Sequence, residues 1–189
     1  LKTGVAVRGT LNAPGDVDES WTVELAFPWK VLAEHANRPA PPADGDQWRV
    51  NFSRVEWLHE VLDGQYKKVP KTPEDNWVWS PQGVIDMHRP ERWGYLQFST
   101  AKPGQAKFRP DPDWSAREAL YRAYYAQRDH FKKNGVFAPT ARDLGLKQLE
   151  SRLEVQATRR GFEVSWLDRD AKPPKPLYTI TGDGLIRKQ

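Results

Sequence analysis

Alternating apolar and polar residues predict most of the regular structure in the first hundred residues. The clearest strand is Trp21 to Phe27, in which every second side chain is apolar and shares one face. Pro28 stops this strand and suits the first turn of a short helix. Further strands are expected from Gly4 to Asn12, from Gln47 to Phe52 and from Gly94 to Phe98, the last with Leu96 and Phe98 directed inward.

Turn-forming residues separate these strands. Asn37 to Gly45 contains three prolines and predicts a loop, and the polar segment from Leu58 to Asp75 predicts a long loop with a turn at Asp63-Gly64. A short strand is expected around Trp77 to Trp79. Because only one short helix interrupts the strands, the pattern favours an antiparallel β-sandwich of the immunoglobulin or jelly-roll kind over a parallel α/β sheet.

The pattern changes after residue 100. Ser115 and Glu118 form a capping box that predicts a helix over residues 116–133, ended by Asn134-Gly135, and its aromatic stripe is expected to be a docking face. Short strands are expected at 152–158, 162–167 and 177–180. We therefore predict a β-sandwich domain over residues 1–100 and a helix-plus-hairpin extension over residues 101–189.

Composition divides the chain at the same place. Seven of the nine Trp residues precede residue 100. Residues 1–100 contain 11 basic and 14 acidic residues, a net charge of −3, whereas residues 101–189 contain 18 basic and 11 acidic residues, a net charge of +7. The overall net charge is only +4, and its basic residues are interleaved with acidic ones, which argues against a nucleic-acid partner.

Cys is absent, which excludes disulfides and thiolate metal sites, and no apolar run reaches membrane-spanning length. Because the chain has no initiator Met and opens in an alternating stretch, we interpret it as a fragment or processed product that lacks the N-terminal part of its domain.

An indole beside charged groups marks the first candidate site. Beyond Phe52 the core face of the strand would have to accept Arg54 and Glu56, so the strand is expected to leave the core there or to bulge. Arg54, Glu56 and Trp57 offer a flat ring, a planar donor and a carboxylate, which suit a polyhydroxylated ring. A rim ion pair beside a half-exposed Trp is an equally good interpretation.

Trp77 and Trp79 form a second aromatic pair. They are expected to share one face of their strand, which is either an open aromatic shelf or a core that buries two indoles. Asn76, Gln82 and His88 are further candidates for carbohydrate binding, although His88 is also explained as a satisfied loop histidine. Asp16, Asp18 and Glu19 are candidates for Ca²⁺, but they lack the spacing and glycine of a Ca²⁺ loop, which favours a solvated turn.

Three ordered blocks carry a resemblance to a known family. They are residues 21–29, 45–54 and 90–98, which read WTVELAFPW, GDQWRVNFSR and PERWGYLQF. Over about residues 1–100 the chain resembles the family 9 carbohydrate-binding modules, particularly the large bacterial group called family 9-like. Residues 101–189 resemble the C-terminal extension of that same group.

The resemblance implies a fold, a ligand and a setting. The fold is a β-sandwich related to the sugar- and haem-binding DOMON domains, with structural Ca²⁺ in several members. The ligands are ends of glucan or xylan chains, small sugars, or both, held between two Trp rings. By position, Trp77 or Trp79 would supply one ring, Arg54 and Glu56 the polar contacts, and Trp57 or the missing N-terminal portion the opposing ring. Such modules are commonly joined to xylanases and other secreted glycoside hydrolases, so the expected location is secreted, periplasmic or on the bacterial cell surface.

Three function classes follow. Non-catalytic carbohydrate binding in the degradation of polysaccharides such as cellulose and xylan is the leading one. A glycoside hydrolase acting on xylan or glucan would need two carboxylates about 5 to 9 Å apart, and Glu56, Glu60, Glu74 and Asp75 are available. A haem-binding electron-transfer domain would need axial Met or His ligands, and Met87 and His88 adjoin each other, so that His35, His59 or His130 would have to help.

Overall fold

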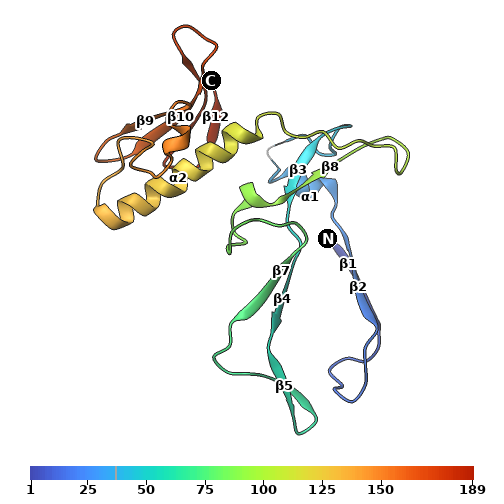
Figure 1. Cartoon of the computed structure of the whole chain (residues 1–189). Helices are drawn as coiled ribbons and strands as arrows, with labels where there is room; N and C mark the ends of the chain where they lie inside the picture. The colour runs from blue at the N-terminus through green and yellow to red at the C-terminus, as the bar shows by residue number, and fades with distance from the viewer. Residues whose placement is uncertain (37) are drawn as a thin grey trace. The chain divides into compact units, whose positions relative to one another are not determined.

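The computed structural model describes residues 1–36 and 38–189, so the first residue of the predicted loop at 37–45 lies outside the described residues. The chain divides into two units, Leu1–Arg109 and Pro110–Gln189 (Figure 1). The boundary expected after residue 100 falls inside unit 1. Its physical cause is the side chain of Gln97, which donates to the Lys107 carbonyl at 2.9 Å and accepts from the Arg109 N–H at 2.8 Å, and so holds residues 107–109 to the preceding strand.

Unit 1 is mainly β, and its strands pair antiparallel, two by two. The pairs are β1 (Lys2–Arg8) with β2 (Ser20–Ala26), β3 (Gln47–Val50) with β8 (Gly94–Gln97), β4 (Ser53–Trp57) with β7 (Glu74–Val78), and β5 (His59–Leu62) with β6 (Gln65–Lys68). The short helix α1 (Trp29–Ala33) follows Pro28, as its position after the second strand predicted, and a 3₁₀ turn spans Pro90–Arg92.

One face of the β1–β2 pair is apolar. The register sets Val5 opposite Val23 and Val7 opposite Trp21, so these four side chains share a face, and between 37% and 68% of each remains exposed. Within the described part of unit 1, Gln82 is the only buried side chain.

The exposed surface of the chain is larger than its mass requires. Two separate compact units of these lengths would together expose about 11,000 Å², whereas the chain exposes 14,236 Å². Among the described residues the buried apolar side chains all belong to unit 2, whereas most of the large apolar side chains of unit 1 are exposed.

A ring cluster forms where α1 meets the β3–β8 pair. The Trp48 centroid lies 6.2 Å from Trp29 and 5.2 Å from Phe98, both edge to face. Phe98 therefore packs as predicted, but Leu96 does not, because it is 40% exposed opposite Trp48.

The predicted strand at 47–57 changes partner in the middle. β3 pairs with β8, the ladder breaks at residues 51–52, and β4 then pairs with β7. The prediction was that the strand leaves the core or bulges near Phe52, and the side chains of β3 are partly buried whereas those of β4 are exposed.

The loop predicted from Leu58 to Asp75 is wrong over most of its length. Residues 59–68 form the β5–β6 hairpin, and its turn is at Asp63-Gly64 as expected, with φ of 53° and 72°. Two successive positive φ values define the turn that suits the twist of a two-residue hairpin, and Gly64 adopts this conformation without strain. Pro70 and Pro73 fall between β6 and β7 and leave the hairpin undisturbed.

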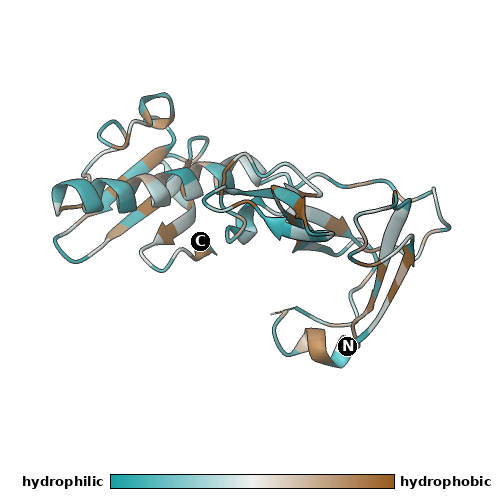
Figure 2. Ribbon diagram, turned by 90° about the horizontal axis from the view of Figure 1, so that it is seen from below, coloured by the Kyte–Doolittle hydropathy of each residue, from teal (hydrophilic) through white to brown (hydrophobic). Residues whose placement is uncertain are grey.

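Unit 2 has a packed core between one helix and one sheet. Helix α2 (Trp114–Asn134) precedes a 3₁₀ turn (Lys147–Leu149) and strands β9 (Leu153–Ala157), β10 (Phe162–Asp168), β11 (Lys175–Thr181) and β12 (Ile186–Lys188). The sheet order is β12-β11-β10-β9, antiparallel throughout. Apolar positions recur along α2 in Figure 2, and Leu120 and Ala123 on this stripe are fully buried against Val164 and Ile180 in the same cluster. The prediction that the aromatic stripe docks is confirmed only in part, because Tyr121 and Tyr124 pack against this cluster but Phe131 is 41% exposed.

Two expectations for unit 2 are corrected. The helix begins before Ser115, so there is no capping box: Asp113 occupies the N-cap position, and its carboxylate accepts the Tyr178 hydroxyl at 2.6 Å instead of capping. The expected hairpin is a four-stranded sheet, because β12 adds to β11 after the turn at 182–184. Thr140 caps the following turn, since its Oγ1 accepts from the Asp143 N–H at 3.1 Å.

Candidate functional site

The β4–β7 ribbon brings Trp77 beside charged groups. The register sets Trp77 opposite Arg54 and Asp75 opposite Glu56, so these four side chains share one face. Arg54 Nη2 donates to Glu56 Oε2 at 2.5 Å, and the Arg54 guanidinium carbon lies 5.9 Å from the Trp77 ring centroid. Trp77 is 61% exposed, the highest fraction of any Trp in the chain. We refer to Arg54, Glu56, Asp75 and Trp77 as the Trp77 face.

Trp57 lies on the opposite face of this ribbon. It pairs with Glu74, and its ring faces Lys68, whose Nζ is 5.0 Å from the ring centroid. Asn76 belongs to this second face, where its Nδ2 donates to Glu74 Oε1 at 3.3 Å. Because alternate residues point to opposite sides of a strand, Trp57 and Trp77 do not face each other across one sugar within this ribbon.

Trp79 does not share a strand face with Trp77, because β7 ends at Val78. Its indole N–H donates to the Val50 carbonyl at 3.0 Å, and its ring lies edge to face on Phe52 at 5.7 Å. A Cβ on Gly94 would come within 2.7 Å of Trp79 Cζ2, so the ring rests directly on the backbone of β8. Trp79 is therefore held in place by its contacts with Val50, Phe52 and Gly94, although 47% of its side chain is exposed.

The other polar candidates occupy the loop after β7. Gln82 is 7% exposed, and its Nε2 has no hydrogen-bond partner among the described residues. His88 is exposed, and its backbone N–H donates to Asp86 Oδ1 at 3.0 Å. That hydrogen bond, followed by the ion pair with Arg89, holds the pKa of Asp86 below its ordinary value. Neither Gln82 nor His88 belongs to the Trp77 face.

An aromatic row on the Trp57 side was not predicted. His59 and Tyr66 face each other diagonally across β5–β6 with ring centroids 5.1 Å apart, and Lys68 pairs with His59. The signal in the sequence is the alternation of Trp57, His59 and Val61, which the long-loop interpretation concealed.

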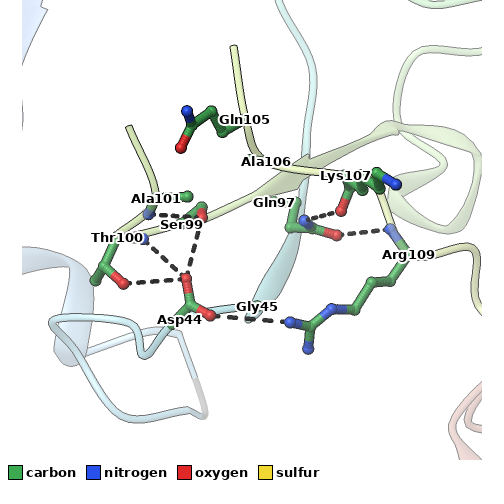
Figure 3. A pocket seen from close by; sticks show the side chains of 10 residues that line it. All are labelled: Asp44, Gly45, Gln97, Ser99, Thr100, Ala101, Gln105, Ala106, Lys107 and Arg109. Atoms are coloured by element: carbon green, nitrogen blue, oxygen red, sulfur yellow. Dashed lines mark hydrogen bonds and ion pairs between the residues drawn. The ribbon is translucent and has the colours of Figure 1, made fainter. Parts of the chain in front are cut away.

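Unit 1 also carries a shallow polar pocket of about 390 Å³ near the start of β3 (Figure 3). Asp44, Gly45, Thr100, Lys107 and Arg109 are among its lining residues. Asp44 Oδ1 accepts from the Thr100 N–H at 2.8 Å and from the Ser99 hydroxyl at 3.0 Å. These hydrogen bonds, the first of them foremost, hold the pKa of Asp44 below its ordinary value, so Asp44 is a carboxylate at neutral pH.

The carboxylates considered for metal binding and for hydrolysis have other neighbours. Asp18 accepts from the Thr10 N–H at 2.7 Å, Asp16 accepts from the Thr10 hydroxyl at 2.9 Å, and Glu19 pairs with Arg8 at 3.1 Å. Over residues 1–36 and 38–189 no group of three His, Asp or Glu side chains is arranged to hold a metal ion. Of the hydrolase candidates, Glu56 and Asp75 lie opposite each other on the Trp77 face, while Glu60 pairs with Lys67 across β5–β6 and Glu74 lies on the Trp57 side.

None of the described helices has the length and apolarity to cross a bilayer. No protein-family model, curated protein or solved structure matches this chain.

Proposed function

We propose that unit 1 binds carbohydrate without catalysis and that the Trp77 face is the contact surface. The observation that carries the proposal is the exposed Trp77 indole beside the Arg54–Glu56 ion pair. The C–H face of a pyranose stacks on an indole, while guanidinium and carboxylate groups exchange hydrogen bonds with its hydroxyls.

The expected affinity is weak. One stacked ring contributes about 0.5–1.5 kcal/mol beyond area burial, and hydrogen bonds to charged groups contribute about 1.5–3 kcal/mol each when they are shielded from water. Because Arg54 and Glu56 are half exposed and association carries its own entropic cost, these terms predict dissociation constants from micromolar to millimolar.

We also propose that unit 1 has the β-sandwich fold and the family membership that its sequence resemblance implies. The apolar face of β1–β2 and the ring cluster on β3–β8 each have the one-sided pattern of a sandwich layer. They support the interpretation of unit 1 as a β-sandwich of the family 9-like kind. Its setting would be polysaccharide degradation outside the bacterial cytoplasm, in association with a glycoside hydrolase domain. Structural Ca²⁺ is an expectation of that resemblance, and a change in melting temperature on chelation would detect it.

The test is a titration of xylohexaose and cellohexaose against intrinsic Trp fluorescence. The Trp77→Ala variant should weaken binding by about 2- to 13-fold, from the loss of one stacked ring. Trp21→Ala is the matched control, because Trp21 is 56% exposed on a different strand pair and should leave binding unchanged. Equal affinity of Trp77→Ala and the parent chain would refute the proposal.

The register supplies one observation in favour of a glycoside hydrolase. Glu56 and Asp75 are cross-strand neighbours, whose Cβ atoms lie about 4.5–5.5 Å apart. Side chains on such neighbouring positions can bring their carboxyl groups to the roughly 5–5.5 Å separation of a retaining pair. Glu56→Gln separates the two functions, since a hydrolase would lose product release from xylohexaose while a binding module would show none in either chain.

A further inference from the structure

The pocket beside Asp44 is held in shape by hydrogen bonds from three separate segments. Gln97 binds both the Arg109 N–H and the Lys107 carbonyl, and Gln47 Nε2 donates to the Arg109 carbonyl at 2.5 Å. The backbone of Arg109 is therefore fixed on both sides. In Figure 3 the Arg109 side chain turns back from this point toward Asp44.

Gly45 makes room for the guanidinium group. Its φ is 86°, and a Cβ at this position would lie 2.6 Å from Arg109 Nη1. The turn itself is fixed, because the Gly45 N–H donates to the Phe98 carbonyl at 2.8 Å. A residue without a side chain is thus required both by the backbone conformation and by the close approach of Arg109.

The two charged groups in the pocket approach each other without making a hydrogen bond. Arg109 Nη2 lies 3.8 Å from Asp44 Oδ2, beyond hydrogen-bond length. Ser99 and Thr100 occupy the other oxygen of Asp44, so the Oδ2 lone pairs remain directed toward the guanidinium and the pocket. A hydroxyl group can occupy this space, because it can donate to Oδ2 and accept from Nη2 at the same time.

We propose that this pocket is a binding site for a small polyol, which it holds through a vicinal diol. One hydroxyl bridges Asp44 and Arg109, and its neighbour meets the polar rim formed by Thr100, Gln105 and Lys107. Asp44 disfavours a simple anion beside Arg109, because its own carboxylate would repel that anion. The polar lining likewise disfavours an apolar ligand. This site is independent of the Trp77 face, since it is built from other strands and needs no stacking ring.

The Asp44→Asn variant isolates the proposed contact. Asn keeps an acceptor oxygen for Ser99 and Thr100, but it replaces the free carboxylate oxygen with a donor that cannot accept the ligand hydroxyl. Arg109→Gln replaces the charged guanidinium with a shorter neutral amide and leaves the backbone hydrogen bonds of residue 109 in place. Lys102→Gln is the control, because Lys102 lies in the same loop and does not line the pocket.

The experiment is an NMR titration of the full chain, following the amide signals of Thr100 and Ala101. Methyl β-xyloside and cis-1,2-cyclohexanediol should shift these signals in a saturable manner, and cyclohexanol should not. Asp44→Asn and Arg109→Gln should each weaken binding at least fivefold, whereas Lys102→Gln and Trp77→Ala should leave it unchanged. Equal shifts with cyclohexanol, stronger binding of acetate, or full affinity in both pocket variants would overturn the proposal. Loss of xylohexaose binding at the Trp77 face alone would leave it intact.

Discussion

The packing of α2 on its sheet makes Leu120→Ala the sharpest test of unit 2. Leu120 is fully buried in the cluster that joins the helix to β10 and β11. Ala is at least as good a helix former as Leu, so the variant removes packing without weakening the helix itself. A buried Leu→Ala change costs about 2.7–5 kcal/mol, according to the size of the cavity left behind.

This cost is a large share of the free energy of unfolding expected for unit 2. At about 0.05–0.15 kcal/mol per residue, a unit of this length has a free energy of unfolding of roughly 4–12 kcal/mol. Each kcal/mol lowers the melting temperature of a domain this small by about 4–8 °C, so the variant should melt roughly 10–40 °C lower.

Differential scanning calorimetry and amide hydrogen exchange of β10 and β11 would measure the change. Leu185→Ala is the matched control, because Leu185 is 61% exposed and its truncation should stay within about 0.5 kcal/mol. Similar losses in the two variants would refute the assignment of the core to this helix face.

Three further predictions concern single features of the fold. Tyr178→Phe should cost about 1.5–3 kcal/mol, because it removes a hydrogen bond to the Asp113 carboxylate. That hydrogen bond is the main reason that the pKa of Tyr178 is raised, and burial adds to it. The native state therefore holds the Tyr178 proton more tightly than the unfolded chain does. The resulting stabilisation is complete below pH about 10 and is lost as the pH rises through the pKa of the folded state. Urea denaturation of the parent protein and of the Tyr178→Phe variant between pH 8 and 12 should show this loss of unfolding free energy in the parent and not in the variant. Gly64→Val should cost about 1–2 kcal/mol at φ 72° and speed amide exchange in β5 and β6, while an unchanged exchange rate would contradict the turn. Changing both Val5 and Val23 to Thr should lower the fluorescence of a bound apolar dye, and an unchanged signal would show that the β1–β2 face is not the exposed apolar surface.

Local periodicity identified strands well and partners poorly. The alternation of Trp21 to Phe27 placed β2 to within one residue at each end. The alternation of residues 47–57 also predicts a strand, but the partner of each half lies between 17 and 50 positions away. Since the partner fixes the register, the sequence pattern alone could not show that Trp57 and Trp77 point to opposite faces. The β5–β6 hairpin was missed because its strands are short and polar and prolines follow them.

The candidate site was predictable only where its members are close in sequence. Arg54 and Glu56 are two residues apart on one strand, so their contact follows directly from the period of a strand. Gln82 is polar, yet it is buried, and burial depends on tertiary contacts that no local pattern reports. The pocket escaped prediction for the same reason, because Asp44, Thr100 and Arg109 come together only through the pairing of β3 with β8.

The most direct test of carbohydrate binding at the Trp77 face is the ¹H–¹⁵N spectrum of the Trp indoles during addition of xylohexaose. We predict that the Trp77 indole signal and the Arg54 Nε signal shift together in a saturable manner, while the Trp114 and Trp166 indole signals of unit 2 stay in place. A Trp77 signal that does not move at saturating sugar, or shifts confined to unit 2, would contradict the account.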